Sequence, residues 1–355
     1  MGVHVFGHAK TSIGLDLGAT GARAVEMAWR DGKPTVERAA LVAYDSPIVD
    51  WANADQQRLA NVIMEVTQRQ GMRGRWVAHA VSGEAVAPQY FNFPQLMPED
   101  VPEAVRIEVE TALPFRAETA LISYVLFPEQ RQAQGKVRTH GLAIAADGPF
   151  VESRLAPIRR ANMEAFCMEP ASSACVNALL ACKALESNAN AGILNIGYRY
   201  SNLALTGSGG TLLVRDVPWA GAHLTEHIAA KMGVQAAEAE EMKRRHWAQA
   251  GAAAGAAALP MGEILQNDAH DFVVRLRDTI EYWISEKLVG PLTRIIITGG
   301  GSQVPEMPDF LSQSLNVPVE RWAPPLGPTM PGTHYEMTVA FGLAMREFDL
   351  RKRNG

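Results

Sequence analysis

The feature that most constrains this chain is a strand–turn–strand pattern that occurs twice. Residues 12–29, SIGLDLGATGARAVEMAW, alternate apolar residues with small or polar ones up to a Gly-Ala-Thr-Gly bend and then resume, which predicts a β-hairpin. Residues 192–206, GILNIGYRYSNLALT, repeat the order of apolar strand, polar residue, glycine, hydroxyl and returning strand. An internal repeat limits the possible folds far more than one hairpin does. We therefore expect two cores of one design.

The first bend has the residue types of a phosphate site. Gly18 and Gly21 permit positive φ and carry no Cβ, so the amides of residues 18–21 could converge on an anion beside the Thr20 hydroxyl. Asp16 ends the first strand, where a carboxylate could hold the Mg²⁺ that accompanies a nucleotide. An ordinary hairpin with a turn aspartate is the alternative.

A second glycine-rich bend follows near the carboxyl end. Residues 294–298 form a dense apolar strand, Gly299, Gly300 and Gly301 a bend, and residues 307–315 a helix. Amides at a helix start carry partial positive charge, so this bend is a second candidate anion site. A plain strand-to-helix turn is the alternative, but it would normally need one glycine rather than three.

The remaining pattern places these bends in a larger order. Each hairpin is followed by a third strand, at 33–42 and 212–217, and then by a helix, which gives β-β-β-α twice. Residues 84–152 read as a small inserted subdomain that contains a proline-rich stretch, one helix and two strands. Later segments are a charged helix, a poorly ordered Ala/Gly loop, a long amphipathic helix and a closing helix with a small-residue face, at 235–247, 250–258, 267–288 and 335–348.

Composition excludes several classes of function. The chain is 47% hydrophobic and 20% charged, as globular proteins are, and its net charge of −5 gives no general attraction for nucleic acid or anionic lipid. The three cysteines and nine histidines show no metal-binding spacing. There is no apolar run of about 18 residues and no leader, so we expect a soluble, cytoplasmic protein that meets a membrane only through partners.

Seven short motifs, in order, give the chain a family resemblance. They are GLDLGAT (14–20), EVETALPF (108–115), MEPASSACVNAL (168–179), LNIGYRYS (194–201), AEEMK (239–243), ITGGGSQVP (297–305) and VAFGLAMR (339–346). With the repeated cores they resemble the actin, sugar-kinase and heat-shock ATPase superfamily, and within it most closely the FtsA-like PilM family of type IV pilus assembly proteins. The resemblance covers nearly the whole chain.

The resemblance implies an α/β fold of the actin-like ATPase, or ribonuclease H-like, kind: two β-β-β-α-β-α cores with a small subdomain inserted in the first. Its domains would be a first core (1A) at 11–83, 153–188 and 331–350, an inserted subdomain (1C) at 84–152, a second core (2A) at 189–225 and 293–330, and a helical subdomain (2B) at 226–292.

The resemblance also assigns roles around ATP and Mg²⁺. Asp16 would act on Mg²⁺ through water, and Glu169 would stand near the attacking water. The phosphates would be held by Gly18, Ala19, Thr20, Gly21, Gly197 and Ser201, the ribose or base by Glu240 and Lys243, and the adenine by Gly299, Gly300, Gly301 and Ser302.

One position departs from the family pattern. The second phosphate motif normally carries a carboxylate where this chain has Asn195, which adds no negative charge to the metal shell. A charged hydrogen bond is worth about 1.5–3 kcal/mol, so we expect ATP binding with slow or absent hydrolysis, at most a weak ATPase. A nucleotide-free scaffold is the alternative.

The resemblance further implies an adaptor. Proteins of this family are similar in taking a short amino-terminal peptide of the membrane protein PilN in a cleft between the first core and its insertion, with a pilus motor ATPase or platform protein as a further partner. Such an adaptor would lie at the inner face of the inner membrane. The candidate groove residues are Tyr90, Phe91, Phe93 and Phe115, for which core packing of the insertion is the alternative.

Two other functions remain open on the sequence. A small-molecule kinase of the same superfamily would need a base aspartate, and none stands at Asn195 or in residues 168–175. A polymer-forming FtsA-like protein would carry an amphipathic membrane-targeting helix at its end, for which residues 351–355 are too short and too polar.

Overall fold

A computed structural model describes residues 11–30, 33–128, 137–248, 260–286 and 288–354. The chain divides into two compact units. Unit 1 contains residues 1–81, 149–184 and 323–355, and unit 2 contains residues 82–148 and 185–322. We describe each unit by itself.

Unit 1 is built on a five-stranded sheet of order β3-β2-β1-β4-β8. Its strands are β1 (Thr11–Gly18), β2 (Gly21–Arg30), β3 (Lys33–Ala43), β4 (Trp76–Val81) and β8 (Glu164–Pro170). The first three are antiparallel neighbours, whereas β4 and β8 run parallel to β1. The predicted hairpin is confirmed: Gly18 pairs with Gly21 across a two-residue loop.

Helices cover both faces of this sheet because side chains of β1 alternate between them. Ile13, Leu15 and Leu17 enter one hydrophobic core together with side chains of α1 (Gln56–Val66) and α3 (Gly148–Arg160). The opposite face of β1 packs on α10 (Thr338–Asn354), which lies beside α4 (Ala171–Ala181). There a Cβ on Gly14 would overlap the carbonyl oxygen of Ala340 in α10.

Unit 2 repeats the same sheet. Its order is β11-β10-β9-β12-β13, with β9 (Ala191–Ile196), β10 (Ser201–Thr206), β11 (Leu212–Val217), β12 (Arg294–Thr298) and β13 (Val319–Arg321). Again the first three are antiparallel and the last two are parallel to the first. The two predicted cores therefore share one topology, although the short strand β13 was not expected.

Five helices accompany this second sheet: α5 (Gly221–Met232), α6 (Ala236–Ala248), α7 (Met261–Asp268), α8 (His270–Ser285) and α9 (Met307–Leu315). The amphipathic helix expected at 267–288 is confirmed as α8, but the break at Ala269 that separates it from α7 was not expected. The weak helix formers Asn267 and Asp268 precede this break. The loop expected at 250–258 lies outside the described residues.

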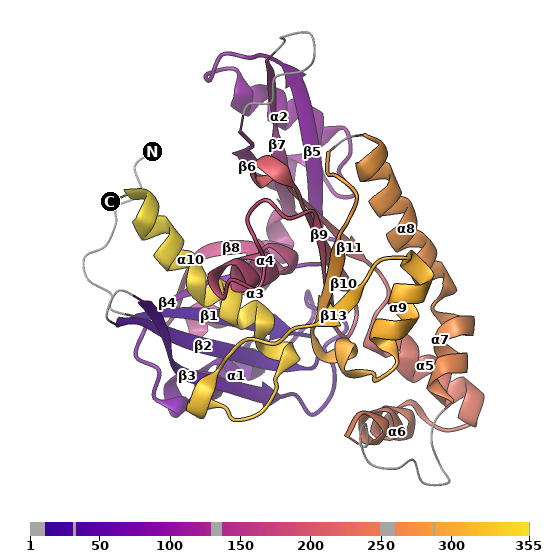
Figure 1. The fold of residues 1–355 in the computed structure, drawn as a ribbon. Helices are drawn as coiled ribbons and strands as arrows, with labels where there is room; N and C mark the ends of the chain where they lie inside the picture. The colour runs from indigo at the N-terminus through magenta and orange to yellow at the C-terminus, as the bar shows by residue number, and fades with distance from the viewer. Residues whose placement is uncertain (1–10, 31–32, 129–136, 249–259, 287, 355) are drawn as a thin grey trace. The chain divides into compact units, whose positions relative to one another are not determined.

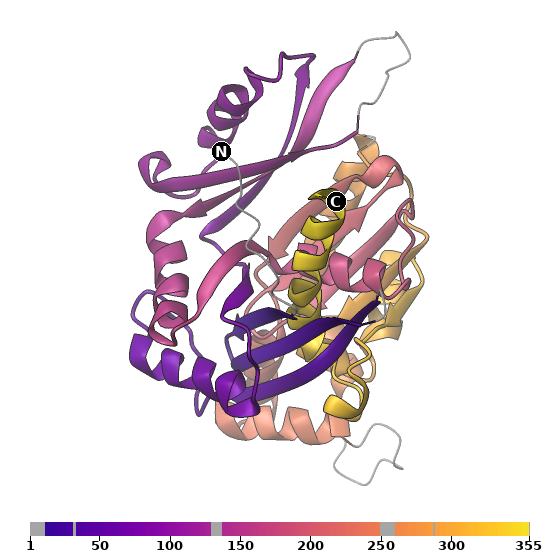
Figure 2. The ribbon, with the colours of Figure 1, turned by 90° about the vertical axis from the view of Figure 1, so that its left-hand side faces the viewer.

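The insertion forms a separate three-stranded sheet of order β5-β7-β6, with α2 (Val101–Glu110) on one face (Figure 2). Its strands are β5 (Val86–Pro94), β6 (Ala120–Leu126) and β7 (Arg138–Asp147). The prolines of residues 88–102 hid β5 from sequence analysis. Proline is tolerated in β5 because that strand lies at the edge of its sheet.

Single-turn helices lie at Gln68–Gln70, Ala117–Thr119, Ser208–Gly210, Gly300–Gln303, Gly327–Thr329 and Tyr335–Met337. Among the helices that the structure describes, none is long and apolar enough to cross a membrane.

Candidate functional site

The two predicted catalytic carboxylates lie near the carboxyl-terminal ends of parallel strands in the sheet of unit 1. Leu15 of β1, His79 of β4 and Met168 of β8 are paired across the parallel strands, so Asp16, Ala80 and Glu169 occupy the next level. Asp16 and Glu169 are separated by two strand spacings, about 10 Å. The sheet thus brings Asp16 and Glu169 to one edge with only the small Ala80 between them.

Glu169 is buried and held in place. Its carboxylate accepts hydrogen bonds from Nδ2 of Asn177 at 3.2 and 3.3 Å and lies 3.9 Å from Nε of Arg346 in α10. Cys175 of α4 lies close to both carboxylates, and burial together with their charges raises the pKa of its thiol. This thiol is therefore neutral and adds no charge to the site.

Asp16 is partly buried beside two arginines. Burial raises the pKa of its carboxyl group, and the charges of Arg23 and Arg154 oppose that rise. Arg23, on the returning strand β2, places Nη1 3.7 Å from the Asp16 carboxylate and 3.1 Å from the Gly21 carbonyl oxygen. Its Nη2 lies 3.4 Å from Oγ1 of Thr20. The Arg23 guanidinium thus lies between the predicted metal ligand and the predicted phosphate ligand.

The bend itself differs from the expectation. Neither Gly18 nor Gly21 has a positive φ. Glycine is required for space instead: a Cβ on Gly18 would stand 2.6 Å from Nη1 of Arg23, and one on Gly21 would stand 2.5 Å from the carbonyl oxygen of Val42. The expected use of positive φ at this bend is therefore wrong, and the absence of Cβ atoms is what matters.

Arg154 is a buried charged residue near Asp16 that sequence reasoning missed. Its Nη2 donates to the carbonyl oxygen of Leu17 at 2.6 Å, its Nε lies 3.3 Å from Nε2 of His79, and its guanidinium carbon lies 3.6 Å over the Trp51 ring. Burial, reinforced by Arg154, lowers the pKa of His79 to about 3, so this histidine is neutral. Burial lowers the pKa of Arg154 only to about 10, so it keeps its charge.

A sequence signal for these two arginines existed. Arg154 stands one helical turn before Ile158, on the buried side of α3, and Arg23 interrupts a strand of small and apolar residues. A charge among buried positions needs a partner, which is the signal that could have identified both residues.

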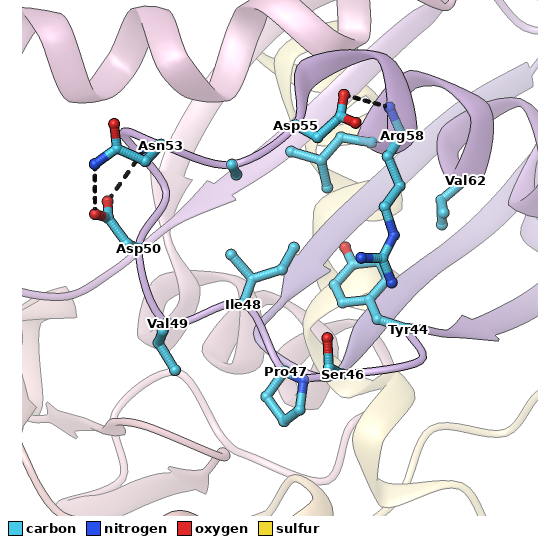
Figure 3. A pocket seen from close by; sticks show the side chains of 12 residues that line it. Tyr44, Ser46, Pro47, Ile48, Val49, Asp50, Asn53, Asp55, Arg58 and Val62 are labelled. Atoms are coloured by element: carbon cyan, nitrogen blue, oxygen red, sulfur yellow. Dashed lines mark hydrogen bonds between the residues drawn. The ribbon is translucent and has the colours of Figure 1, made fainter.

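The segment that follows β3 attaches to the bend. The amides of Tyr44 and Ile48 donate to the carbonyl oxygens of Thr20 and Ala19 at 3.0 and 2.8 Å. The same segment and α1 enclose a pocket of about 220 Å³ (Figure 3), in which Asp55 caps α1. Arg58, which also lines the pocket, pairs with the exposed Asp45 at 3.1 Å. Its other lining residues are Tyr44, Ser46, Pro47, Ile48, Val49, Asp50, Asn53, Ala54, Leu59 and Val62.

Unit 2 carries the equivalent bend with an amide in place of the carboxylate. Asn195 precedes Gly197 by two positions, as Asp16 precedes Gly18. Nδ2 of Asn195 donates to Oδ1 of Asn202 at 2.7 Å, and Nδ2 of Asn202 donates to Oδ1 of Asp216 at 2.7 Å. The Gly83 amide, where the insertion begins, donates to Oδ2 of Asp216 at 2.6 Å. We call this chain of hydrogen bonds the Asn195 relay.

The glycine-rich bend lies directly against Asn195. Gly299 has φ +82°, and a Cβ there would overlap Oδ1 of Asn195, while a Cβ on Gly301 would overlap the Ile196 side chain. A Cβ on Gly300 would meet nothing within 4 Å. Ser302 is buried and its hydroxyl donates to the Gly299 carbonyl oxygen at 2.7 Å. The bend therefore packs tightly on the sheet at Gly299 and Gly301, whereas Gly300 has free space around it.

Other predicted ligands of unit 2 are engaged inside the protein. The Ser201 hydroxyl is buried and donates to the Trp219 carbonyl oxygen at 2.6 Å. The Lys243 ammonium is buried between the Gly221 carbonyl oxygen, the Thr225 hydroxyl and the Glu240 carboxylate, at 2.8, 2.7 and 2.6 Å. These contacts fix the start of α5 and the position of α6, and the roles of these residues at a ligand stay predictions.

The four aromatic groove candidates divide between the two faces of the insertion's sheet. Phe91 is 1% exposed in a core with α2, and Phe93 and Phe115 pack against that core. Tyr90 faces the other way, stacks on Phe127 at 6.5 Å and packs against the core of the second sheet. Three of the four therefore pack in or against the insertion's own core.

The repeated sheets with their paired bends define a class of protein. MreB 5 of Spiroplasma citri, in a structure bound to AMPPNP, has a TM-score of 0.51 to this chain at 13% identity, with 98% of each chain covered. The ethanolamine utilization protein EutJ from Carboxydothermus hydrogenoformans has a TM-score of 0.54 at 15% identity, over 94% of this chain and 89% of that one. This chain has the duplicated α/β fold of the actin-like ATPases.

The family within that class follows from a further match. The family model for the type IV pilus assembly protein PilM matches residues 14–348, so the chain belongs to this family. A solved structure of a PilM-PilN type IV pilus biogenesis complex has a TM-score of 0.79 at 24% identity, over 94% of this chain and 98% of that one. The resemblance predicted from the seven motifs is confirmed.

Proposed function

We propose that this chain is an ATP-binding adaptor of a type IV pilus or related secretion machine that hydrolyses ATP slowly or not at all. The observation that carries the proposal is the repeated bend, with Asp16 and Gly18 in unit 1 and Asn195 and Gly197 in unit 2 at equivalent strand ends. The fold is that of MreB 5, which its structure shows bound to AMPPNP. ATP is the nucleotide that we expect here.

Slow hydrolysis follows from the charges at these strand ends. Phosphoryl transfer depends mainly on positioning and on stabilising the developing negative charge. Only one of the two equivalent positions carries a carboxylate, and that one lies beside Arg23. Asn195, whose Nδ2 is engaged by Asn202, adds no charge.

A substitution at Gly300 tests nucleotide binding. Because a Cβ at Gly300 meets open space, Gly300→Val should leave the thermal unfolding temperature unchanged while its side chain fills the approach to the bend. We expect the affinity for ATP, measured by equilibrium dialysis, to fall at least about tenfold, or 1.4 kcal/mol. Gly262→Ala, at another open glycine in α7, is the control and should bind ATP normally. Equal affinities of the Gly300 variant and the unsubstituted chain would contradict a ligand at this bend.

We further propose that the insertion binds an extended amino-terminal peptide of a PilN-like membrane protein, through which this chain would be held at the inner face of the inner membrane. A structure of a PilM-PilN complex has the fold of this chain. The edge strand β6 exposes Leu121 and Val125, at 54% and 47% of their surface, on the face opposite α2. Tyr90 shares that face, since Tyr90 and Val125 both pair with Leu142. A strand edge with exposed apolar side chains can accept an added peptide strand.

The peptide proposal has a matched test. A synthetic peptide of the membrane protein's cytoplasmic amino terminus should bind the full chain at micromolar strength by calorimetry, about 8 kcal/mol. Leu121→Glu and Val125→Glu should each weaken binding, whereas Ile107→Glu, equally exposed on α2, should not. Equal effects of all three substitutions would place the peptide elsewhere. A motor ATPase or platform protein as a second partner remains a prediction from the resemblance.

A further inference from the structure

The residues around Asp16 are a poor set of ligands for Mg²⁺. This ion prefers octahedral oxygen ligands, usually one or two carboxylates with waters and substrate phosphates. Asp16 offers one carboxylate, and the charged groups that act on it are Arg23 and Arg154. One carboxylate can suffice for such a site, but the guanidinium of Arg23, 3.7 Å from the Asp16 carboxylate, repels a divalent cation there.

The same residues do suit an anion. Arg23 and Arg154 contribute two positive charges against the single carboxylate of Asp16, since His79 is neutral and burial raises the pKa of Tyr44 to about 12. The balance among these groups is one positive charge, and Glu169, on the far side of Ala80, lies 3.9 Å from the compensating charge of Arg346. A partly buried positive balance attracts phosphate and repels a divalent cation.

Arg23 has the geometry of a direct phosphate ligand. Its guanidinium lies over the bend and contacts both Thr20 and Gly21, and Gly18 lacks the Cβ that would displace it. Its Nε–H is buried with no hydrogen-bond partner. A guanidinium has five N–H donors, and phosphate oxygens match its planar fork. Arg23 therefore retains donor capacity at the position where the first phosphate motif of the family meets its ligand.

We propose that the bend of unit 1 receives the phosphates of a nucleotide through Arg23 directly, without a divalent cation between Asp16 and the phosphates. In this arrangement Arg154 adds a second positive charge and is itself held by Trp51, His79 and the Leu17 carbonyl oxygen. Asp16 pairs with Arg23 rather than with a metal ion, while contacts with Thr20 and Gly21 also hold the guanidinium in place. The inference rests on the proposed nucleotide binding and changes only what neutralises the phosphates.

The test is ATP binding to the full chain, by equilibrium dialysis, in excess EDTA and in excess MgCl₂. We expect the two dissociation constants to agree within about threefold. Arg23→Gln should weaken binding at least about tenfold in both buffers because a charge-assisted hydrogen bond is lost. Arg30→Gln, on the same strand but paired with Glu37, is the control and should leave both constants unchanged.

The substitution Asp16→Asn should change ATP affinity in opposite directions, depending on whether Arg23 or a Mg²⁺ ion held by Asp16 contacts the phosphates. If Arg23 is the phosphate ligand, removing the carboxylate raises the positive balance, so ATP affinity in EDTA should be kept or increased. If Asp16 holds Mg²⁺, the same variant should lose Mg-ATP binding. Binding that requires Mg²⁺ and ignores Arg23→Gln would overturn the inference and leave ATP binding intact. An absence of ATP binding in both buffers would overturn the inference together with the nucleotide part of the proposed function.

Discussion

At the scale of single residues, the Asn195 relay explains why an amide stands where a carboxylate is expected. Asn202 donates its NH₂ group to Asp216 and has only its oxygen left for position 195. A carboxylate at 195 would face that oxygen, and two close unpaired acceptors are unfavourable. The direction of donation is set by Asp216, which accepts from both Asn202 and Gly83.

Reversing the direction of the hydrogen bonds in the Asn195 relay should therefore need two substitutions. Asn195→Asp alone should lower the free energy of unfolding by about 1–3 kcal/mol. Asn195→Asp combined with Asp216→Asn should recover most of that loss, since Asn202 can rotate its amide, donate to the new carboxylate at position 195 and accept from the new amide at position 216. Chemical denaturation of the four forms gives the coupling energy. The double variant also carries the missing carboxylate, so any gain in ATP turnover should appear there most clearly. Additive losses would show that the relay does not act as a unit.

Asp216 should also make stability depend on pH. Burial raises its pKa to about 6, against the hydrogen bonds from Gly83 and Asn202. A carboxyl group with a raised pKa in the folded state binds more protons there, so its stabilising contribution is present below the unfolded pKa and is lost as pH rises through about 6.

Asp216→Asn removes this titration. The free energy of unfolding of the unsubstituted chain minus that of the variant should fall by about 1–3 kcal/mol from about pH 4 to pH 7.5. The variant's own cost, an amide facing the Gly83 N–H, does not change with pH and cancels from this slope. A pH-independent difference would mean that Asp216 is not desolvated as the structure shows.

The sequence predicted that Asp16 and Asn195 stand at equivalent positions of two hairpins, because the same strand–glycine pattern surrounds both residues. It did not predict Arg23 and Arg154 beside Asp16. Their contacts depend on residues distant in the chain, as when Arg154 of α3 reaches the Leu17 carbonyl oxygen. It also could not tell that Ser201 and Lys243 would find partners within the protein.

At the scale of elements, α10 packs so closely on its neighbours that glycine is needed at the contact. A Cβ on Gly342 would overlap the carbonyl oxygen of Ala174 in α4, and the Ser12 hydroxyl of β1 donates to the Ala344 carbonyl oxygen at 2.8 Å. The tight packing predicted for the closing helix is confirmed, but its small residues lie on two faces: Ala340 and Ala344 contact β1, whereas Gly342 contacts α4.

Gly342→Ala should therefore lower the free energy of unfolding by about 1–3 kcal/mol, because backbone atoms must move apart to admit one methyl group. Gly262→Ala, at an open position of helix α7, should stabilise the chain slightly because alanine is the better helix former. Thermal and denaturant unfolding of both variants provide the comparison. A neutral Gly342→Ala would mean that α10 moves freely against α4.

Helices and strands with a clear hydrophobic periodicity could be predicted from the sequence. Strands that form only because they lie at the edge of a sheet could not. β12 and α9 occupy the residues expected of them. β5 was missed because its prolines are acceptable only at a sheet edge, which local sequence does not reveal. The break between α7 and α8 was missed because the apolar spacing through Phe272, Leu276 and Ile280 belongs to α8 alone.

At the scale of the whole molecule, the repeat predicted the duplicated fold, but the sequence could not show which sheet the insertion joins. Within unit 2, the Gly83 amide is bonded to Asp216, the Tyr200 hydroxyl donates to Glu84 at 2.9 Å, and Tyr90 packs on the core of the second sheet. The insertion and the second sheet thus form one compact unit. The surface proposed for the peptide and the Asn195 relay consequently belong to the same unit.

If ATP binds at the two bends as proposed, hydrogen exchange on the full chain should report on each bend separately. ATP should slow the amides of residues 18–23 in unit 1 and those of residues 299–302 in unit 2. Gly300→Val changes unit 2 alone. It should reduce the protection of residues 299–302, because the ligand loses its contacts at that bend.

The contradicting outcome is specific. If residues 299–302 stay protected by ATP in Gly300→Val, the second bend does not contact the nucleotide as proposed. If ATP leaves the exchange of residues 18–23 unchanged in the unsubstituted chain, the first bend, Arg23 included, does not contact it. Protection of both segments in the unsubstituted chain, with loss at residues 299–302 in the variant, is the result that fits a use of both copies of the bend.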